Sequence, residues 1–205
     1  GVLSEESILS LVMDAFADQL PAGLDPSLIA TFLGALLDQD LDDQIETGVE
    51  VLRRGGTVAL PTDTLYGLSA DAFNEAAVER VFEAKGRPYG MPLPLLLPDS
   101  DWLSVIASDV PPLALQLAER FWPGPLTVIL PRQSKVPDEI TGGRDTVGLR
   151  VPNHPVAQAV LTAFGSGLAA PSANRFGRIS PTQADHVRSE FGERIGQSIL
   201  LLDGG

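Results

Sequence analysis

The fold of this chain is organised around one short stretch of sequence. An apolar run, residues 58–60, is followed directly by Pro61-Thr62-Asp63-Thr64-Leu65-Tyr66-Gly67-Leu68. The apolar run predicts a buried strand, which ends at Pro61 because proline has no N–H to donate to a sheet ladder. In an extended segment Thr62, Thr64 and Tyr66 would point to one side. A polar, glycine-ended turn after a strand is typical of ligand sites in α/β sheets; a surface turn with incidental threonines is the alternative.

Apolar runs of strand length alternate with amphipathic segments of helix length through the rest of the chain. Strands are predicted at 57–60, 93–97, 126–130, 147–151, 168–170 and 199–202, and helices at 75–84, 112–121, 155–164 and 183–191. The last helix is expected to be capped by Ser180-Pro181-Thr182, and residues 131–145 to form a loop. This alternation predicts an α/β sheet domain.

The amino-terminal segment differs from the rest in pattern and in charge. Residues 1–40 predict a small helical hairpin, and a third helix follows and ends in Arg53-Arg54-Gly55-Gly56. We therefore divide the chain into an acidic helical extension, 1–40, and a main domain, 41–205. Residues 1–50 hold eleven acids and no Lys or Arg, whereas residues 51–205 hold sixteen acids and fourteen bases. This acidity opposes binding of nucleic acid.

Composition excludes several kinds of chemistry. The chain has no cysteine, and therefore no disulfide, thiolate nucleophile or Cys-ligated zinc. Its only histidines, His154 and His186, predict no histidine-rich metal site, and we interpret both as structural. No apolar run reaches the length of a membrane helix and no leader pattern is visible, so we expect a cytoplasmic protein without a membrane partner.

Three basic residues are candidates for binding anions. Lys85 and Arg87 lie two apart in a segment broken by glycine and proline, so both can point into one volume and hold a phosphate or carboxylate. The alternative is a basic helix end that complements the helix dipole. Arg150 lies in an otherwise apolar strand, where its guanidinium must find an anion or face solvent from an edge strand.

Neutral donors gather in the last third of the chain. Ser172 and Asn174 follow the end of a predicted strand, and Ser180 precedes a predicted helix. They supply hydroxyl, amide and backbone N–H groups without a strong base; ordinary Asx and Ser turns are the alternative. The common phosphate-binding and nucleophile-elbow glycine motifs are absent.

These motifs together resemble a known family. The segments are Pro61–Leu68, Lys85-Gly-Arg-Pro88, Trp122-Pro-Gly-Pro-Leu-Thr127, Val147-Gly-Leu-Arg-Val-Pro152, Pro171-Ser-Ala-Asn174 and Ser180-Pro-Thr182. In order and spacing they resemble the YrdC-like threonylcarbamoyl-AMP synthases over about residues 42–205. The resemblance implies a twisted mixed β-sheet, flanked by helices, with a concave ligand site. It also implies a reaction that condenses L-threonine, bicarbonate and ATP, with Mg²⁺, and releases pyrophosphate. A downstream transferase would pass the threonylcarbamoyl group to a tRNA adenosine.

The same resemblance implies a role for each candidate residue. Thr64, Arg150 and Ala170 would contact threonine, and Arg87, Thr146, Ser172, Asn174 and Ser180 would line the nucleotide site. Lys85 and Arg87 would be the catalytic cations. No protein metal ligands are implied.

The chain also departs from the family pattern. Met91 and Leu96 stand where many members have Asn and His. The main domain is expected to lack the strand and arginine that follow Asp203-Gly204-Gly205 in the family. Two alternatives stay open: a carbamoyl-adenylate-forming domain that uses carbamoyl phosphate, and a non-catalytic module that binds double-stranded RNA, tRNA or a protein partner.

Overall fold

A computed structural model describes residues 41–204 of the chain, and residues 45–204 form one compact unit. The predicted helical hairpin at 1–40 lies outside the described residues. A helix over residues 41–53 precedes a seven-stranded sheet of order β4-β5-β3-β6-β2-β1-β7. Two of its strand pairs, β1 with β7 and β3 with β5, are parallel, and the other pairs are antiparallel. The predicted twisted, mixed sheet flanked by helices is confirmed.

The elements follow the chain in an order that places late strands among early ones. The strands are β1 (Thr57–Leu60), β2 (Gly67–Asp71), β3 (Leu95–Leu96), β4 (Val128–Pro131), β5 (Thr146–Arg150), β6 (Leu168–Ala169) and β7 (Ile199–Leu201). The α-helices are α3 (Glu75–Lys85), α4 (Leu103–Ile106), α5 (Pro112–Phe121), α6 (Asp138–Thr141), α7 (Pro155–Phe164) and α8 (Ala184–Phe191), and short 3₁₀ turns cover Ser100–Trp102 and Gly192–Arg194.

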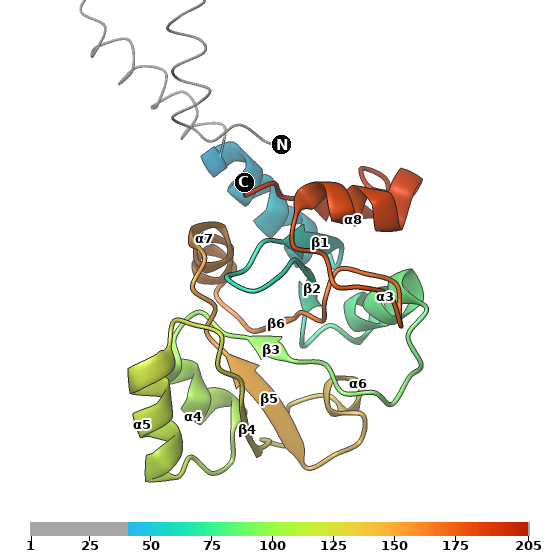
Figure 1. Ribbon diagram of the computed structural model, residues 1–205. Coiled ribbons are helices and arrows are strands. Elements are labelled where there is room, and N and C mark those ends of the chain that lie inside the picture. The colour runs from blue at the N-terminus through green and yellow to red at the C-terminus, as the bar shows by residue number, and fades with distance from the viewer. Residues whose placement is uncertain (1–40, 205) are drawn as a thin grey trace, which may run out of the picture. The chain divides into compact units, whose positions relative to one another are not determined.

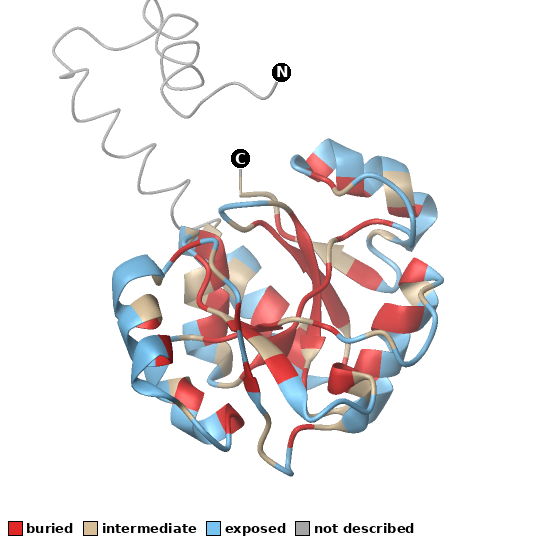
Figure 2. Cartoon of the chain, turned by 60° about the horizontal axis from the view of Figure 1, so that its bottom comes forward, coloured by how far each residue is buried: buried red, intermediate tan, exposed pale blue. Residues whose placement is uncertain are grey.

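Helices cover both faces of the sheet, so its central strands are buried. Figure 1 shows α7 on one side of β1 and β2, and α3 with α8 on the other. One apolar cluster joins α3 and α8 to β1, β2 and β7, and a larger one joins α3, α4, α5 and α6 to β3, β4, β5 and β6. Figure 2 shows the result, with buried residues along the strands and exposed residues on the outer helix faces. Apolar side chains fill most of this core, because each buried polar group needs a hydrogen-bond partner.

Most predicted elements are present, but some differ. Strand β2 was missed, because its sequence Gly-Leu-Ser-Ala-Asp has no β-branched or aromatic residue. The predicted loop 131–145 contains the short helix α6, and the strand predicted at 93–97 is reduced to β3. The prediction that Ser180-Pro181-Thr182 caps the last helix is wrong: the N-cap of α8 is Gln183, and it makes no side-chain capping bond.

The hairpin of β1 and β2 positions the stretch that organises the fold. Leu60 pairs with Gly67, so residues 61–66 form the connection between the two strands. Strand β6 pairs with β2 through Ala70 and Ala169, and the chain that leaves β6 therefore runs beside the start of β2. This arrangement brings residues 61–67 and 170–174 together.

Candidate functional site

The connection at 61–66 is a hydroxyl-stabilised turn. The Thr62 hydroxyl donates to Leu65 O at 2.6 Å and accepts from the backbone N–H groups of Thr64 and Leu65, at 3.3 and 3.2 Å. The Thr62 and Thr64 hydroxyl oxygens lie 3.1 Å apart. Tyr66 is buried at 2% exposure. The extended arrangement expected for Thr62, Thr64 and Tyr66 is therefore wrong, because Thr62 folds its own backbone into a turn.

Arg150 ends strand β5 and reaches this turn. Its Nη1 donates to the Thr64 hydroxyl at 2.9 Å, its Nη2 pairs with the Asp63 carboxylate, and its Nε donates to Gly124 O at 2.9 Å. The same Asp63 oxygen accepts from Asn153 N at 3.0 Å. Strand β5 lies between β4 and β3, so a surface arginine on an edge strand is excluded. As expected from the cost of burying an unpaired charge, Arg150 has found an anion.

The turn that follows α5 supplies one of the partners of Arg150. Gly124 N donates to Val151 O at 2.8 Å while its carbonyl accepts from Arg150, so this turn is fixed to the end of β5. A Cβ on Gly124 would lie 2.3 Å from Phe121 O, so only glycine fits. The preceding peptide bond, Trp122-Pro123, is cis, and the Trp122 indole donates to Leu126 O at 2.7 Å.

The segment 170–174 lies against the other side of the same turn. Gly67 bridges to Ser172, Leu68 N donates to Pro171 O at 2.8 Å, and Ala173 N donates to Tyr66 O at 2.7 Å. A Cβ on Gly67 would lie 3.4 Å from the Ala170 Cβ, an ordinary contact, so the two segments are joined by their backbone hydrogen bonds. Ala170 itself is 8% exposed, and its N–H donates to Pro94 O. Its carbonyl faces the start of β2.

Lys85 is held inside this segment. The residue is 2% exposed, and its ammonium donates to the carbonyl oxygens of Ser172 and Asn174. Burial, and next the neighbouring charge of Arg87, lower the pKa of Lys85 to about 8, whereas Glu190 raises it. Gly86 ends α3 in the left-handed conformation, at φ 59°, and so redirects the chain between the two cations.

Arg87 follows with a more open side chain. Its Nη2 donates to Pro92 O at 3.0 Å, its Cζ lies 5.7 Å from the centre of the Phe176 ring, and its buried Nε has no partner. Burial lowers the pKa of Arg87. Phe176 N donates to Lys85 O at 2.8 Å, so the segment 172–176 wraps around both cations. Lys85 is the last residue of α3 and the more buried of the two, and Arg87 lies just beyond the helix; that both point into one ligand volume stays a prediction.

Three further predicted residues, Asn174, Thr146 and Ser180, have different surroundings. Asn174 is buried; its Nδ2 donates to Arg175 O and Arg178 O, and its Oδ1 has no partner. Thr146 is exposed at the start of β5, about 13 Å along the strand from Arg150 at a rise of about 3.3 Å per residue. Ser180 lines a hollow of about 280 Å³ with Pro181 and residues of α8.

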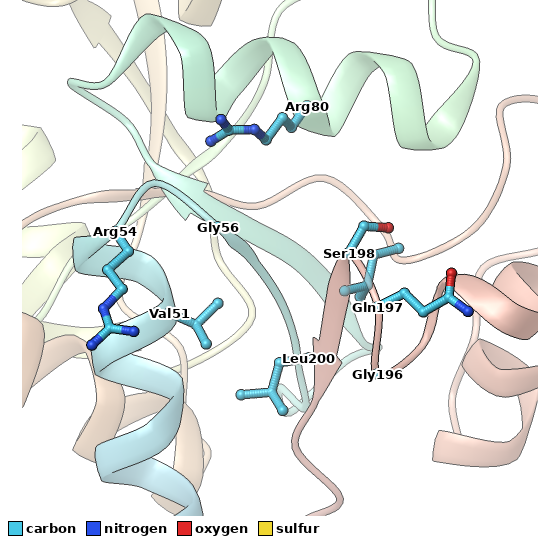
Figure 3. A pocket seen from close by; sticks show the side chains of 9 residues that line it. Val51, Arg54, Gly56, Arg80, Gly196, Gln197, Ser198 and Leu200 are labelled. Atoms are coloured by element: carbon cyan, nitrogen blue, oxygen red, sulfur yellow. The ribbon is translucent and has the colours of Figure 1, made fainter.

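A larger hollow lies away from these residues. It measures about 420 Å³ and is lined by Val51, Arg54, Gly56, Arg80, Gly196, Gln197, Ser198, Ile199 and Leu200 (Figure 3). It adjoins the starts of β1 and β7, whereas the turn at 61–66 leaves the end of β1. None of the predicted site residues lines it.

Within residues 41–204, no three His, Asp or Glu side chains gather as a metal site, and none of the helices is long and apolar enough to cross a bilayer. His154 lies beside the turn, where burial lowers its pKa and Asp63 raises it.

Sequence reasoning missed two members of the site. Asp63 stands in the quoted stretch, but it was not chosen because its partner, Arg150, is 87 residues away. Gly124 contributes only its carbonyl, which no side-chain pattern reveals. The one signal in the sequence that could have indicated Gly124 was its place in a rigid turn directly before the strand predicted at 126–130.

Comparisons with known proteins identify the family of this chain. A mixed sheet flanked by helices, with a polar turn between β1 and β2 that Arg150 contacts, defines the chain as an α/β sheet domain. The sequence model of Sua5/YciO/YrdC, described as "Telomere recombination", matches residues 50–205. The chain belongs to this family.

Individual relatives are similar over most of the chain. A threonylcarbamoyl-AMP synthase of Pyrococcus abyssi is 46% identical over 162 residues, 79% of this chain and 47% of the relative. One of Halorhodospira halophila is 40% identical over 154 residues, 75% of this chain and 81% of the relative. The crystal structure of P. abyssi Sua5 complexed with L-threonine has a TM-score of 0.75 at 46% identity, covering 78% of this chain and 46% of that chain. The chain thus spans about half the length of the first relatives it matches.

Proposed function

We propose that this chain forms threonylcarbamoyl-AMP from L-threonine, bicarbonate and ATP, with release of pyrophosphate. The product would serve a downstream transferase that modifies a tRNA adenosine. The observation that carries the proposal is the contact between Arg150 and Thr64, a guanidinium held beside a hydroxyl at the turn after β1. The relatives named threonylcarbamoyl-AMP synthase support the reaction, and the threonine-bound P. abyssi structure supports the amino acid.

The threonine side of the site would use three elements. Arg150 offers a planar donor fork that suits a carboxylate, and its Nε bond to Gly124 O fixes the plane of that fork. The Thr64 hydroxyl would face the substrate hydroxyl or carboxylate, and the Ala170 carbonyl would accept from the substrate amine. Asp63 holds Arg150 in its orientation before substrate binds.

The nucleotide side would be built from α3 and the segment 172–180. Arg87 would bind the phosphates, because it is the more exposed of the two cations. Lys85 would hold Ser172 and Asn174 in place through their carbonyls and supply positive charge from beneath. Thr146 and Ser180 would contact more distant parts of ATP. Mg²⁺ would arrive on the phosphates, which fits a site without a carboxylate cage among the described residues.

The chemistry would rest on position and charge. The threonine amine attacks the carbon of bicarbonate, and water is lost as the carbamate forms. A carbamate oxygen then attacks the α-phosphorus of ATP, and pyrophosphate leaves. Holding the amine, the carbon and the phosphate in one geometry removes most of the entropic cost. Cations that face the phosphates stabilise the charge that develops on the leaving pyrophosphate.

Calorimetry and pyrophosphate release test this proposal. We expect the full chain to bind ATP with Mg²⁺, to bind L-threonine, and to release pyrophosphate only when threonine and bicarbonate are both present. Arg87→Ala should weaken ATP binding by about tenfold or more, as expected for a charged hydrogen bond worth about 1.5–3 kcal/mol. Arg120→Ala is the matched control, because Arg120 also lies 5.7 Å from an aromatic ring, that of Phe121, but on the distant helix α5.

Two results would contradict the proposal. Pyrophosphate release with carbamoyl phosphate, and without threonine, would instead identify a carbamoyl-adenylate-forming domain. Absence of binding for both ATP and threonine, in a chain that unfolds cooperatively, would identify a non-catalytic module of the same fold.

A further inference from the structure

The chain that leaves β7 folds back onto the turn at 61–66. Leu202 N donates to Ala59 O at 3.0 Å, which extends the pairing with β1 by one residue beyond β7. Two residues later Gly204 N donates to the Tyr66 hydroxyl at 3.4 Å. The segment 202–204 therefore contacts both ends of the connection that carries Thr64.

Gly204 packs closely against the base of the turn. A Cβ at this position would lie 2.6 Å from Pro61 Cγ and 2.8 Å from His154 Cε1. At such distances Pro61 or His154 would have to move to admit a methyl group. Pro61 begins the turn, and His154 precedes α7 beside Asn153, whose N–H holds Asp63. A displacement of Gly204 would thus shift both Pro61 and His154, the two neighbours through which it can move Asp63 relative to Arg150.

Asp203 ties this segment to helix α8. Its Oδ2 accepts from Arg188 Nη2 at 3.0 Å, while Arg188 Nη1 donates to Asp185 Oδ1 at 2.8 Å. The pair between Arg188 and Asp185 stays within one helix, at a spacing of three residues. The pair between Arg188 and Asp203 instead joins the helix to the segment beside the site, so the two bonds of one guanidinium have different consequences.

We propose that Arg188, Asp203 and Gly204 are positioning residues for the turn that binds threonine. Arg188 and Asp203 tether the segment 202–204, and Gly204 sets the position of Pro61, Tyr66 and His154. Arg188 contacts Asp203, and Gly204 contacts the Tyr66 hydroxyl and packs on Pro61, so these residues would act through the turn. The inference rests on the proposed function for its effect on threonine, but the tether itself is independent of any ligand.

Single-residue variants separate the tether from a general effect on folding. Arg188→Gln and Asp203→Asn should each weaken L-threonine binding by about two- to fivefold, the size expected when an exposed ion pair is lost. ATP affinity should stay within about twofold of the wild type. The double variant should be no worse than either single variant, because both remove the same interaction. Asp185→Asn is the control, since it removes only the bond within α8.

Gly204→Ala gives a second and larger test. The added methyl group must displace Pro61 or His154, so threonine affinity should fall by about tenfold or more. Gly196→Ala is not a suitable comparison because Gly196 has φ 81°; Gly167→Ala, with its nearest atom at 3.5 Å, is the matched substitution.

Amide hydrogen exchange measures the tether without a ligand. In Arg188→Gln the amides of Leu202 and Gly204 should exchange faster, and in Asp185→Asn they should keep the wild-type rates. Unchanged exchange in Arg188→Gln would overturn the tether, whether or not the wild type binds threonine. Absence of threonine binding in the wild type would count against the proposed function alone. Equal losses of ATP and threonine affinity would overturn the positioning role, since they would indicate general disruption.

Discussion

The two cations of the site follow one another at a spacing of two residues but have different surroundings. Arg87 keeps a buried N–H without a partner, whereas the Lys85 ammonium already donates to the carbonyls of Ser172 and Asn174. An ammonium has three N–H groups, so two are used inside the protein. Lys85 is therefore part of the loop that it stabilises. It would act on a bound phosphate through its positive charge and not through a direct hydrogen bond.

The buried position of Lys85 predicts how stability depends on pH. Its folded pKa of about 8 lies below the unfolded value of 10.5. Between these values the unfolded chain binds the extra proton, so stability rises as the pH increases from 8 to 10.5. The gain has an upper bound of about 3 kcal/mol, at 1.36 kcal/mol per pKa unit. The two carbonyl oxygens that accept from Lys85 favour its charged form and therefore make this gain in stability smaller.

Urea unfolding at pH 7.5, 9 and 10.5 checks this prediction. The wild type should gain stability relative to Lys85→Met as the pH rises, because methionine has no proton to lose. Lys135→Met, a change in the 131–137 segment outside the site, should run parallel to the wild type. A difference between the wild type and Lys85→Met that stays constant over this range would contradict a depressed pKa.

Strands and helices were predictable from the sequence where a single periodicity ran through them. The helices α3, α5 and α7 have apolar stripes and glycine or proline at their ends, and each lies within a residue of its predicted range. Strand β2 was not predictable in this way. It is held in the sheet by pairing with β1 and β6 on either side, and not by the strand propensity of its own residues.

The site was predictable in its residue types and not in its contacts. Cations and neutral donors were expected from Arg87, Arg150 and Asn174. The ion pair between Arg150 and Asp63, and the carbonyls around Lys85, depend on strand order, which brings together residues more than 80 positions apart. No local pattern contains that information.

The turn between α5 and β4 gives a prediction at the level of an element. Gly124→Ala should destabilise the protein by about 1–3 kcal/mol, because the new Cβ would overlap Phe121 O and the backbone must move. That movement withdraws the carbonyl that orients Arg150, so threonine affinity should fall more than ATP affinity. Chemical unfolding and calorimetry measure the two effects. Gly167→Ala, with only an ordinary contact at 3.5 Å, should change both by little. Normal threonine binding in Gly124→Ala would show that Arg150 does not need this carbonyl.

The charge of the whole molecule is concentrated at one end of the sequence. Residues 1–50 carry a net charge of −11 out of −13, which leaves −2 on residues 51–205. Affinity for nucleic acid comes largely from phosphates neutralised by Lys and Arg, and it falls steeply with salt. In the described part of the chain the site cations are engaged with carbonyls, a carboxylate or an aromatic ring, which suits a small ligand better than an extended backbone.

This charge distribution predicts that the chain does not bind tRNA tightly. In anisotropy titrations with labelled tRNA, binding should be weaker than about 10⁻⁴ M at physiological salt, the weak end of non-specific protein–DNA binding. Between 50 and 200 mM salt, the affinity should change little, because few counterions can be released. The same preparation should bind ATP, which establishes that the protein is folded. A submicromolar affinity with a steep loss on adding salt would identify a basic surface that outweighs the acidic amino-terminal segment, and would favour the RNA-binding module over the enzyme.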